Sequence, residues 1–263
     1  MCAQRTSLTV DDASERDRVL AFENGLRAIE AFSATRQRMS LSDVARQAGL
    51  SRAAARRYLL TLTATGYAEF DGKYFQLTPR VLRLGYAYVS SVPLPQIAQP
   101  IIEELGERAE EAVALAVLEG SESLIIASSV SRRIVGIFTR VGTHLPAVTS
   151  STGRVLLAGK SDDIVAQRLQ RALPIQKLTP KTRTSPAEIH DEIRRIREQG
   201  YALNDEEIEV GLRVITVPVR NPTGSVVAAL CISTYSGRFE IDQLKRRFLA
   251  VLTEASEKLG MLL

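Results

Sequence analysis

Two short helical patterns, separated only by Gly49-Leu50-Ser51, constrain this sequence most. The first begins with a capping box, in which Ser40 can accept a hydrogen bond from the first turn and Asp43 can reach back. The second begins after the capping residue Ser51 and ends near Gly66. Two short helices joined by a three-residue turn that contains glycine form a helix-turn-helix.

A β-hairpin is predicted over residues 67–77, where the apolar period changes from 3.6 to 2. A two-residue turn at Asp71-Gly72 would place Lys73 at the tip of the hairpin. The apolar side chains that share one face in this pairing are Ala68, Phe70, Phe75 and Leu77. A hairpin that follows a helix-turn-helix gives a winged helix.

An additional helix is predicted ahead of this motif, over residues 20–32, with Phe22, Leu26 and Ile29 on one apolar face. Residues 1–18 contain many polar and few large apolar side chains, which predicts a disordered tail. The winged-helix domain is therefore expected to span residues 19–79.

The helical pattern over residues 52–64 has an apolar side and a basic side. Small side chains allow a helix to approach base edges, and arginine can bind guanine or phosphate. The predicted DNA-binding residues are Ser40, Ser42, Ser51, Arg52, Ala53, Arg56, Arg57 and Lys73. The same basic side could instead be a solvated surface, and winged helices also serve as protein-contact modules.

The distribution of charge favours DNA binding. The first 90 residues hold 13 Lys and Arg against 9 Asp and Glu, whereas the rest of the chain holds 21 of each. A basic excess confined to one third of the chain is expected where that third meets a polyanion.

The remainder of the chain is predicted to be a linker helix over residues 80–94 and an α+β domain over residues 95–263. The leucines and tyrosines of the linker suit either a partner chain or burial in their own domain. Beyond it, helices are predicted at residues 162–171 and 186–199, and a hairpin around residues 221–224. Helices and strands that alternate irregularly indicate an antiparallel sheet with flanking helices.

Several classes of protein are not expected. Cys2 and Cys231 give no disulfide framework, and His144 and His190 have no zinc-ligand spacing. No apolar run suits a secretory signal or a membrane span. We expect a cytoplasmic protein with no metal, no cofactor and no membrane partner. We also expect no enzyme, because Cys231 lies in an apolar strand and neither histidine is near it in sequence.

Hydroxyl-bearing residues open the helix that is predicted to start near Ser150. Its first turn offers unpaired N–H groups and the positive end of the helix dipole, which suit a small carboxylate. Gly153 would allow close approach of the backbone. Alternatively, Ser150 or Ser151 does no more than cap the helix.

Three separated blocks of sequence agree with one family pattern in order and spacing. The first block comprises Asn24-Gly25-Leu26, Ser42-Asp43-Val44-Ala45, Ala48-Gly49-Leu50-Ser51, Arg57 and Gly66-Tyr67. The other two are residues 149–158, and Gly200-Tyr201-Ala202 with Asp205-Glu206-Glu207 and Gly211-Leu212-Arg213. They resemble the IclR family of bacterial transcriptional regulators. Residues 52–62 are most similar to the branch that controls breakdown of protocatechuate and 4-hydroxybenzoate through the β-ketoadipate pathway.

The resemblance implies a GAF-like fold for residues 95–263, a homodimer that can pair into a dimer of dimers, and an effector pocket beside the helix that starts near residue 150. Carried over position by position, that pocket would include Ile134, Ile137, Ser151, Thr152, Asn204, Leu212, Val214, Cys231 and Ser233. Asn204, Val214 and Cys231 depart from the residues usual in the family, so the identity of the effector is left open.

The sequence therefore predicts a regulator that binds double-stranded operator DNA and a small aromatic carboxylate, and that controls aromatic-acid catabolism. One alternative is a regulator that responds to a short keto acid or another non-aromatic effector. Another is a sensor that uses its winged helix for protein contacts.

Overall fold

The computed structural model describes residues 18–33, 35–85, 93–129 and 140–263. These residues belong to two compact units, and the division lies between Tyr88 and Val89. Within the described ranges, no helix is both long and apolar enough to cross a membrane.

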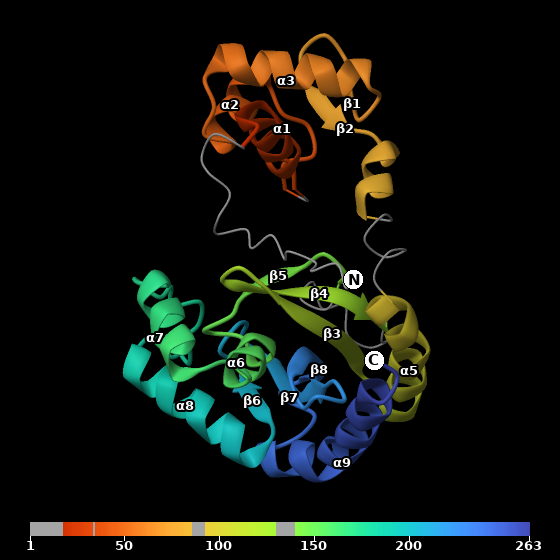
Figure 1. The fold of residues 1–263 in the computed structure, drawn as a ribbon, viewed down its shortest axis with the longest axis vertical. Coiled ribbons are helices and arrows are strands. Elements are labelled where there is room, and N and C mark those ends of the chain that lie inside the picture. The colour runs from red at the N-terminus through yellow and green to blue at the C-terminus, as the bar shows by residue number, and fades with distance from the viewer. Residues whose placement is uncertain (1–17, 34, 86–92, 130–139) are drawn as a thin grey trace, which may run out of the picture. The chain divides into compact units, whose positions relative to one another are not determined.

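The first unit is a winged helix (Figure 1). Its elements are α1 (Leu20–Glu30), α2 (Leu41–Gln47), α3 (Arg52–Ala64), β1 (Ala68–Phe70) and β2 (Phe75–Leu77). The hydroxyls of Ser40 and Ser51 accept from Asp43 N and Ala54 N at 3.3 and 3.2 Å, which starts α2 and α3 as predicted. Val44, Leu59 and Phe75 meet in the core of this unit. The predicted helix-turn-helix and hairpin are confirmed.

The turn of the hairpin differs from the prediction. Phe70 pairs with Phe75, so four residues connect the strands and the expected two-residue turn is wrong. The Asp71 carboxylate accepts from the backbone N–H groups of Tyr74 at 2.7 Å and Lys73 at 2.9 Å, and this side-chain turn sets the longer connection. These N–H groups, together with the Arg38 guanidinium, lower the pKa of Asp71 to about 2.

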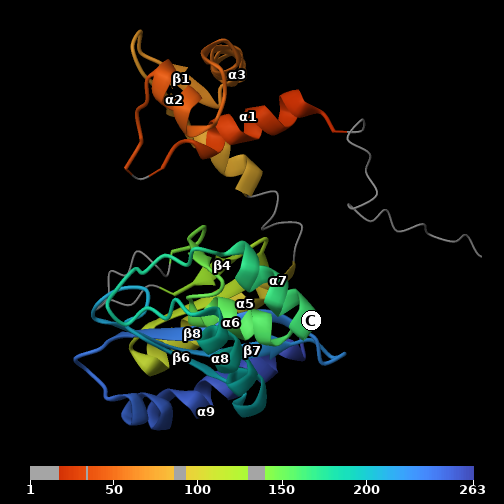
Figure 2. The same ribbon diagram turned by 90° about the vertical axis from the view of Figure 1, so that its left-hand side faces the viewer.

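The apolar faces of α1 and of the hairpin are also less buried than expected. Phe22 and Leu26 of α1 are 69% and 39% exposed, whereas Ala28 is fully buried. Ala28 and Ala31 are buried in the core, and Ile29 packs against it as predicted. The N-terminal half of α1 extends away from α2 and α3 (Figure 2). In the hairpin Phe70 remains 47% exposed, although it stacks on Phe75 at a centroid distance of 4.4 Å.

A short 3-10 helix (Pro79–Val81) follows the hairpin, and residues 82–85 are helical. Leu82 is 75% exposed and Leu84 is 47% exposed, so neither is buried within its own chain. Most of the rest of the predicted linker helix over residues 80–94 lies outside the described residues, and the domain limits stay predictions.

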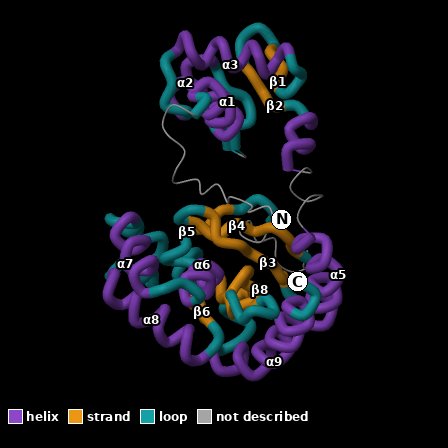
Figure 3. The backbone as a smooth tube through the Cα atoms, viewed as in Figure 1, coloured by secondary structure: helices purple, strands orange, loops and turns teal. Residues whose placement is uncertain are grey.

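The second unit contains an antiparallel sheet between layers of helix (Figure 3). The strands follow the order β5 (His144–Pro146), β4 (Glu122–Ser128), β3 (Ala112–Glu119), β8 (Val226–Tyr235), β7 (Leu212–Arg220) and β6 (Ala202–Asp205). One face is covered by α5 (Pro93–Ala109) and α9 (Ile241–Gly260). The other is covered by α6 (Ser151–Ala158), with α8 (Pro186–Gln199) and then α7 (Asp162–Arg171) outside it.

The predicted α+β architecture is confirmed, with two strands added at the edges. Neither β5 nor β6 was predicted, because each is only three or four residues long. Residues 130–139, between β4 and β5, fall outside the described residues. Along β7 and β8 the side chains alternate in facing. Ile215 of β7 packs toward α9, as do Leu230 and Ile232 of β8. The residues next to them along each strand face α6.

The start of α6 lies very close to the segment that precedes it. An added Cβ at Gly153 would lie 2.2 Å from Ala147 Cα and 2.4 Å from Ala147 O. Backbone atoms cannot move aside as a flexible side chain can, so only glycine fits at this position. The close contact fixes the position of the first turn of α6.

Gly153→Ala should therefore destabilise the second unit by about 1–3 kcal/mol, the usual cost of overpacking. Thermal unfolding followed by circular dichroism measures this loss. Gly25→Ala is the matched control, because no atom lies within 4 Å of a Cβ there and alanine favours a helix. An unchanged Tm for Gly153→Ala would contradict the close packing.

Candidate functional site

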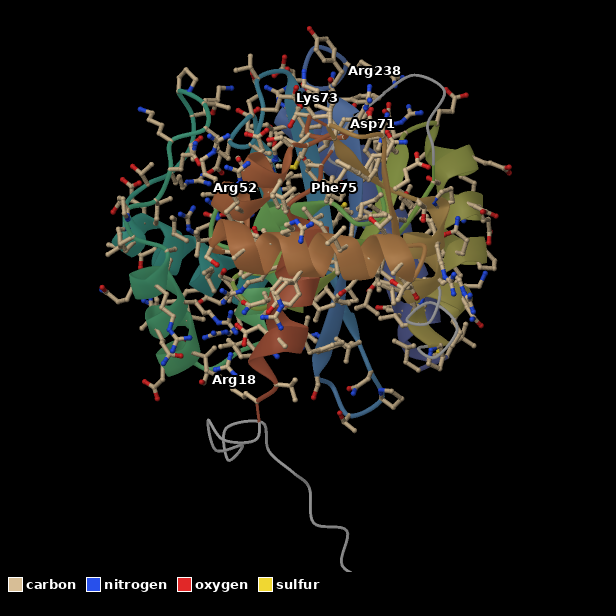
Figure 4. All side chains as sticks on the ribbon, turned by 90° about the horizontal axis from the view of Figure 1, so that it is seen from above. Arg18, Arg52, Asp71, Lys73, Phe75 and Arg238 are labelled. Carbon is tan, nitrogen blue, oxygen red and sulfur yellow. The ribbon has the colours of Figure 1, made fainter. Side chains whose placement is uncertain are left out.

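The outer side of α3 carries four exposed residues of the predicted DNA-binding set: Arg52, Ala53, Arg56 and Arg57. Figure 4 shows Arg52 toward one end of α3, and Asp71 and Lys73 in the turn of the hairpin. Leu60 lies on the same side of α3 and is 43% exposed, so the wing does not cover it. α3 thus presents arginine, alanine and leucine together.

Several arginines of this unit pair with carboxylates, whereas within the described residues those of α3 do not. Arg27, Arg38 and Arg46 form ion pairs with Glu23, Asp71 and Asp43. In the described parts of the chain, no carboxylate lies within ion-pair distance of the α3 arginines. Their guanidinium groups are available for an external anion such as phosphate.

Three other predicted DNA-binding residues lie outside α3, at the start of α2, on α2 and in the wing. Ser40 donates to the Asp43 carboxylate at 2.6 Å, so its hydroxyl is engaged in the cap of α2. Ser42 is exposed on α2. Lys73 is exposed in the wing, with its ammonium 5.0 Å from the centre of the Tyr74 ring.

The second unit encloses a cavity of about 20 Å³ between the α6 face of the sheet and the start of α6. Its walls combine apolar side chains with hydroxyl, amide and thiol groups. The lining residues are Ile125, Leu145, Ser150, Ser151, Thr152, Asn204, Ile208, Leu212, Val214, Cys231 and Ser233. Seven of the nine residues predicted for an effector pocket surround this one cavity. Ile134 and Ile137 lie outside the described residues.

Sequence reasoning missed Ile125, Leu145, Ser150 and Ile208 as lining residues. Strand alternation in β4 could have indicated Ile125. Ile208 follows β6 in an irregular segment and carries no periodic signal.

Of the three hydroxyl groups at the start of α6, one caps the helix, and the other two line the cavity without capping it. Ser150 is the N-cap, since its oxygen accepts from Gly153 N at 3.1 Å and its proton goes to Pro146 O at 2.9 Å. Ser151 and Thr152, each 3% exposed, line the cavity beside the first turn of the helix. The capping alternative therefore holds for Ser150.

Asn204 lines the cavity but uses its amide to hold neighbouring segments together. Its Nδ2 donates to Thr149 O at 3.0 Å, and its Oδ1 accepts from Glu207 N at 3.1 Å. The side chain therefore connects the end of β6 to the segment before α6. This is a shaping role for a residue that was predicted to contact the effector.

A buried ion pair joins α6 to the segment after β6, and that segment contributes Ile208 to the cavity wall. Arg154 of α6 is 1% exposed, and its Nη1 and Nη2 donate to the two oxygens of Glu207 at 2.8 and 2.9 Å. The Arg154 Nε donates to Val148 O at 2.8 Å. Arg183 adds a second guanidinium to the same carboxylate.

Burial raises the pKa of the Cys231 thiol to about 12. Near neutral pH the group is therefore protonated and is a poor nucleophile. The described residues contain no group of three or more metal-ligating side chains.

A larger, open hollow of about 610 Å³ lies on the other side of the sheet, near the end of α9. Pro218, Pro222 and Met261 are among its lining residues, together with polar residues such as Arg220 and Glu257. The smaller cavity is the stronger candidate, because hydroxyls and a helix start meet there.

Two family models together match most of the chain. The model of the IclR helix-turn-helix domain matches residues 21–72, and that of the bacterial transcriptional regulator IclR C-terminal domain matches residues 86–261. The chain belongs to the IclR family of bacterial transcriptional regulators.

Similar proteins cover nearly the whole chain of this IclR-family regulator. The Pca regulon regulatory protein of Pseudomonas putida is 38% identical over 92% of this chain and 84% of its own. The p-hydroxybenzoate hydroxylase transcriptional activator of Acinetobacter baylyi is 33% identical over 95% of this chain and 93% of its own.

The fold also agrees with solved structures. A protein from Rhodococcus sp. RHA1 is 41% identical, with a TM-score of 0.80 over 92% of this chain and 97% of its own. An IclR homologue from Microbacterium hydrocarbonoxydans, solved in complex with 4-hydroxybenzoate, is 26% identical, with a TM-score of 0.77 over 91% of this chain and 97% of its own.

We expect Glu207→Gln to destabilise this IclR-family regulator by about 3–5 kcal/mol, because it leaves the buried charge of Arg154 without full compensation. Urea unfolding followed by circular dichroism measures the loss. Glu206→Gln is the control, since Glu206 pairs with the half-exposed Lys181 and such pairs contribute about 0–1 kcal/mol. Equal losses in the two variants would show that burial of the pair is irrelevant.

Proposed function

We propose that this regulator binds operator DNA through α3 and the wing, and that a small aromatic carboxylate in the cavity beside α6 controls the binding. The observation that carries the proposal is the enclosed cavity, where the first turn of α6 meets apolar walls. A relative named for p-hydroxybenzoate hydroxylase and a similar structure that contains 4-hydroxybenzoate support the aromatic class.

The two sides of the cavity suit the two parts of such a ligand. Leu212, Val214 and Ile125 offer an apolar wall for a ring. The hydroxyls of Ser151 and Thr152, together with the N–H groups of the first turn, suit a carboxylate. At about 20 Å³ the cavity has room for about one water, so the bound state must be more open than this one. A ligand that binds only the open state shifts the population toward it.

The small size of the cavity also favours a second candidate, a short keto acid. Such a ligand needs the same hydroxyls and less enlargement. We propose a binding role rather than catalysis in either case, because Cys231 is the only nucleophilic thiol among the lining residues and stays protonated. A transcriptional regulator acts where the chromosome is, so we expect the protein in the cytoplasm.

Arg56→Ala and Arg57→Ala should each weaken binding to the DNA upstream of the protein's own gene and lower the salt dependence of that binding. Each lost phosphate contact reduces the slope of log affinity against log salt by about 1. Fluorescence anisotropy over a salt series measures both effects. Arg108→Ala on α5 is the control, since Arg108 is also exposed but lies in the other unit. Unchanged affinity in both α3 variants would favour the protein-contact alternative.

The same DNA probe tests the effector. With 4-hydroxybenzoate, protocatechuate and pyruvate added separately, one acid should shift the DNA affinity of the wild-type protein. Ser151→Ala should require about tenfold more of that acid, since a hydrogen bond to a charged group contributes about 1.5–3 kcal/mol. A response to pyruvate alone would replace the aromatic class with the keto-acid alternative. A Ser151→Ala response identical to that of wild type would remove Ser151 from the site.

We also propose a homodimer that is joined through apolar side chains of the first unit. Leu20 and Phe22 of α1 are 63% and 69% exposed, and Leu82 is 75% exposed. Large apolar side chains that stay exposed in one unit are available to form an apolar patch, and large exposed apolar patches commonly mark protein interfaces.

Phe22→Ser combined with Leu82→Ser should give monomers and weaken DNA binding, because a monomer reaches only one half-site. Light scattering after size exclusion measures the mass. Ile164→Ser on α7 is the control, with a 40% exposed side chain in the second unit. A double variant that keeps the wild-type mass would exclude this interface.

A further inference from the structure

Two buried hydroxyl groups contact residues that line the cavity but do not line it themselves. Thr216 on β7 and Ser123 on β4 are both fully buried. Each contacts a residue of α6 that does line the cavity. Ser123 Oγ lies 2.9 Å from Thr152 Oγ1, and Thr216 Oγ1 donates to Ser151 Oγ at 2.8 Å.

The bond from Thr216 sets the direction of the Ser151 proton. A hydroxyl has one proton and two acceptor sites. Because the proton of Thr216 occupies one acceptor site of Ser151, the proton of Ser151 must point elsewhere. Within the described residues, Ser151 Oγ donates no hydrogen bond, and the one it takes part in is accepted from Thr216. A buried donor of this kind calls for an acceptor, which a ligand in the cavity can supply.

Ser150 shows the contrast with a satisfied neighbour. Its proton is donated to Pro146 O, and its oxygen accepts from Gly153 N. Ser150 therefore completes the cap of α6, whereas Ser151 keeps a donor. The difference arises because Thr216 reaches Ser151 from the sheet, 65 residues away in sequence.

We propose that Thr216 is a positioning residue for the effector carboxylate. It holds Ser151 as a hydrogen-bond donor toward the cavity, and thereby favours an anionic oxygen over a neutral one. This inference rests on the proposed effector site. Hydrogen bonds with an ionised partner are roughly twice as strong as neutral ones, so an oriented donor discriminates by charge.

The test compares an acid with its neutral amide in the full-length protein. Titration calorimetry with 4-hydroxybenzoate and 4-hydroxybenzamide is carried out on wild type, Thr216→Val and Thr216→Ser. Thr216→Val keeps the shape and removes the donor, and Thr216→Ser keeps the donor. Thr234→Val is the matched control, because Thr234 is also fully buried but lies one residue from Ser233 and thus on the opposite face of β8.

Thr216→Val should weaken binding of the acid by about tenfold and change binding of the amide by less than about threefold. Thr216→Ser and Thr234→Val should stay within about twofold of wild type. Equal weakening of acid and amide, or no weakening, would overturn the proposal.

A second measurement covers the case in which Thr216→Val does not fold. Ser151→Ala removes the donor itself. In the double variant Ser151→Ala/Thr216→Ala, the affinity for the acid should be no lower than in Ser151→Ala alone, because both residues act through one hydrogen bond. Additive losses would overturn the proposal. Wild type that binds only pyruvate would reject the aromatic class, and equal weakening of pyruvate and pyruvamide in Thr216→Val would then overturn the proposal. Wild type that binds none of these acids would overturn the effector site and this inference together.

Discussion

Arg154 carries its charge into the interior of the second unit, and the surrounding structure has to compensate it. The guanidinium is 1% exposed, and Glu207 meets it with both carboxylate oxygens. Glu207 follows β6, so the ion pair attaches the end of the sheet to α6. Because a buried charge without a partner costs several kcal/mol, this attachment determines where the segment after β6 can lie. That segment then provides Ile208 as part of the cavity wall.

The same attachment explains why polar groups in the cavity wall have different roles. Asn204 and Ser150 satisfy backbone groups around the ion pair, and they give the cavity its shape. Ser151 and Thr152 are instead supported from the sheet by Thr216 and Ser123. One set of residues therefore gives the cavity its shape, and a separate set supports the hydroxyl groups that line it. A substitution in one set can leave the other intact.

Local signals in the sequence predicted the helices well, because caps and apolar periods act within a few residues. The predicted limits of α3, α7 and α8 coincide with the observed ones. The exposure of Phe22 was not predictable, because the choice of the alanine face of α1 depends on tertiary packing. The cavity brings together residues from α6, β7 and β8, so only the family resemblance could group them. Thr216 gave no signal, since its role depends on a contact across 65 residues.

The arginines of α3 and the paired arginines of the second unit have opposite electrostatic roles. In the second unit Arg154, Arg197 and Arg213 are matched by Glu207, Asp162 and Asp205. Such matching leaves little net field outside the unit. On α3 the arginines have no carboxylate partners among the described residues, so their field extends into solvent. We therefore expect a polyanion to be attracted to α3, and the salt dependence of its binding to originate there and not in the second unit.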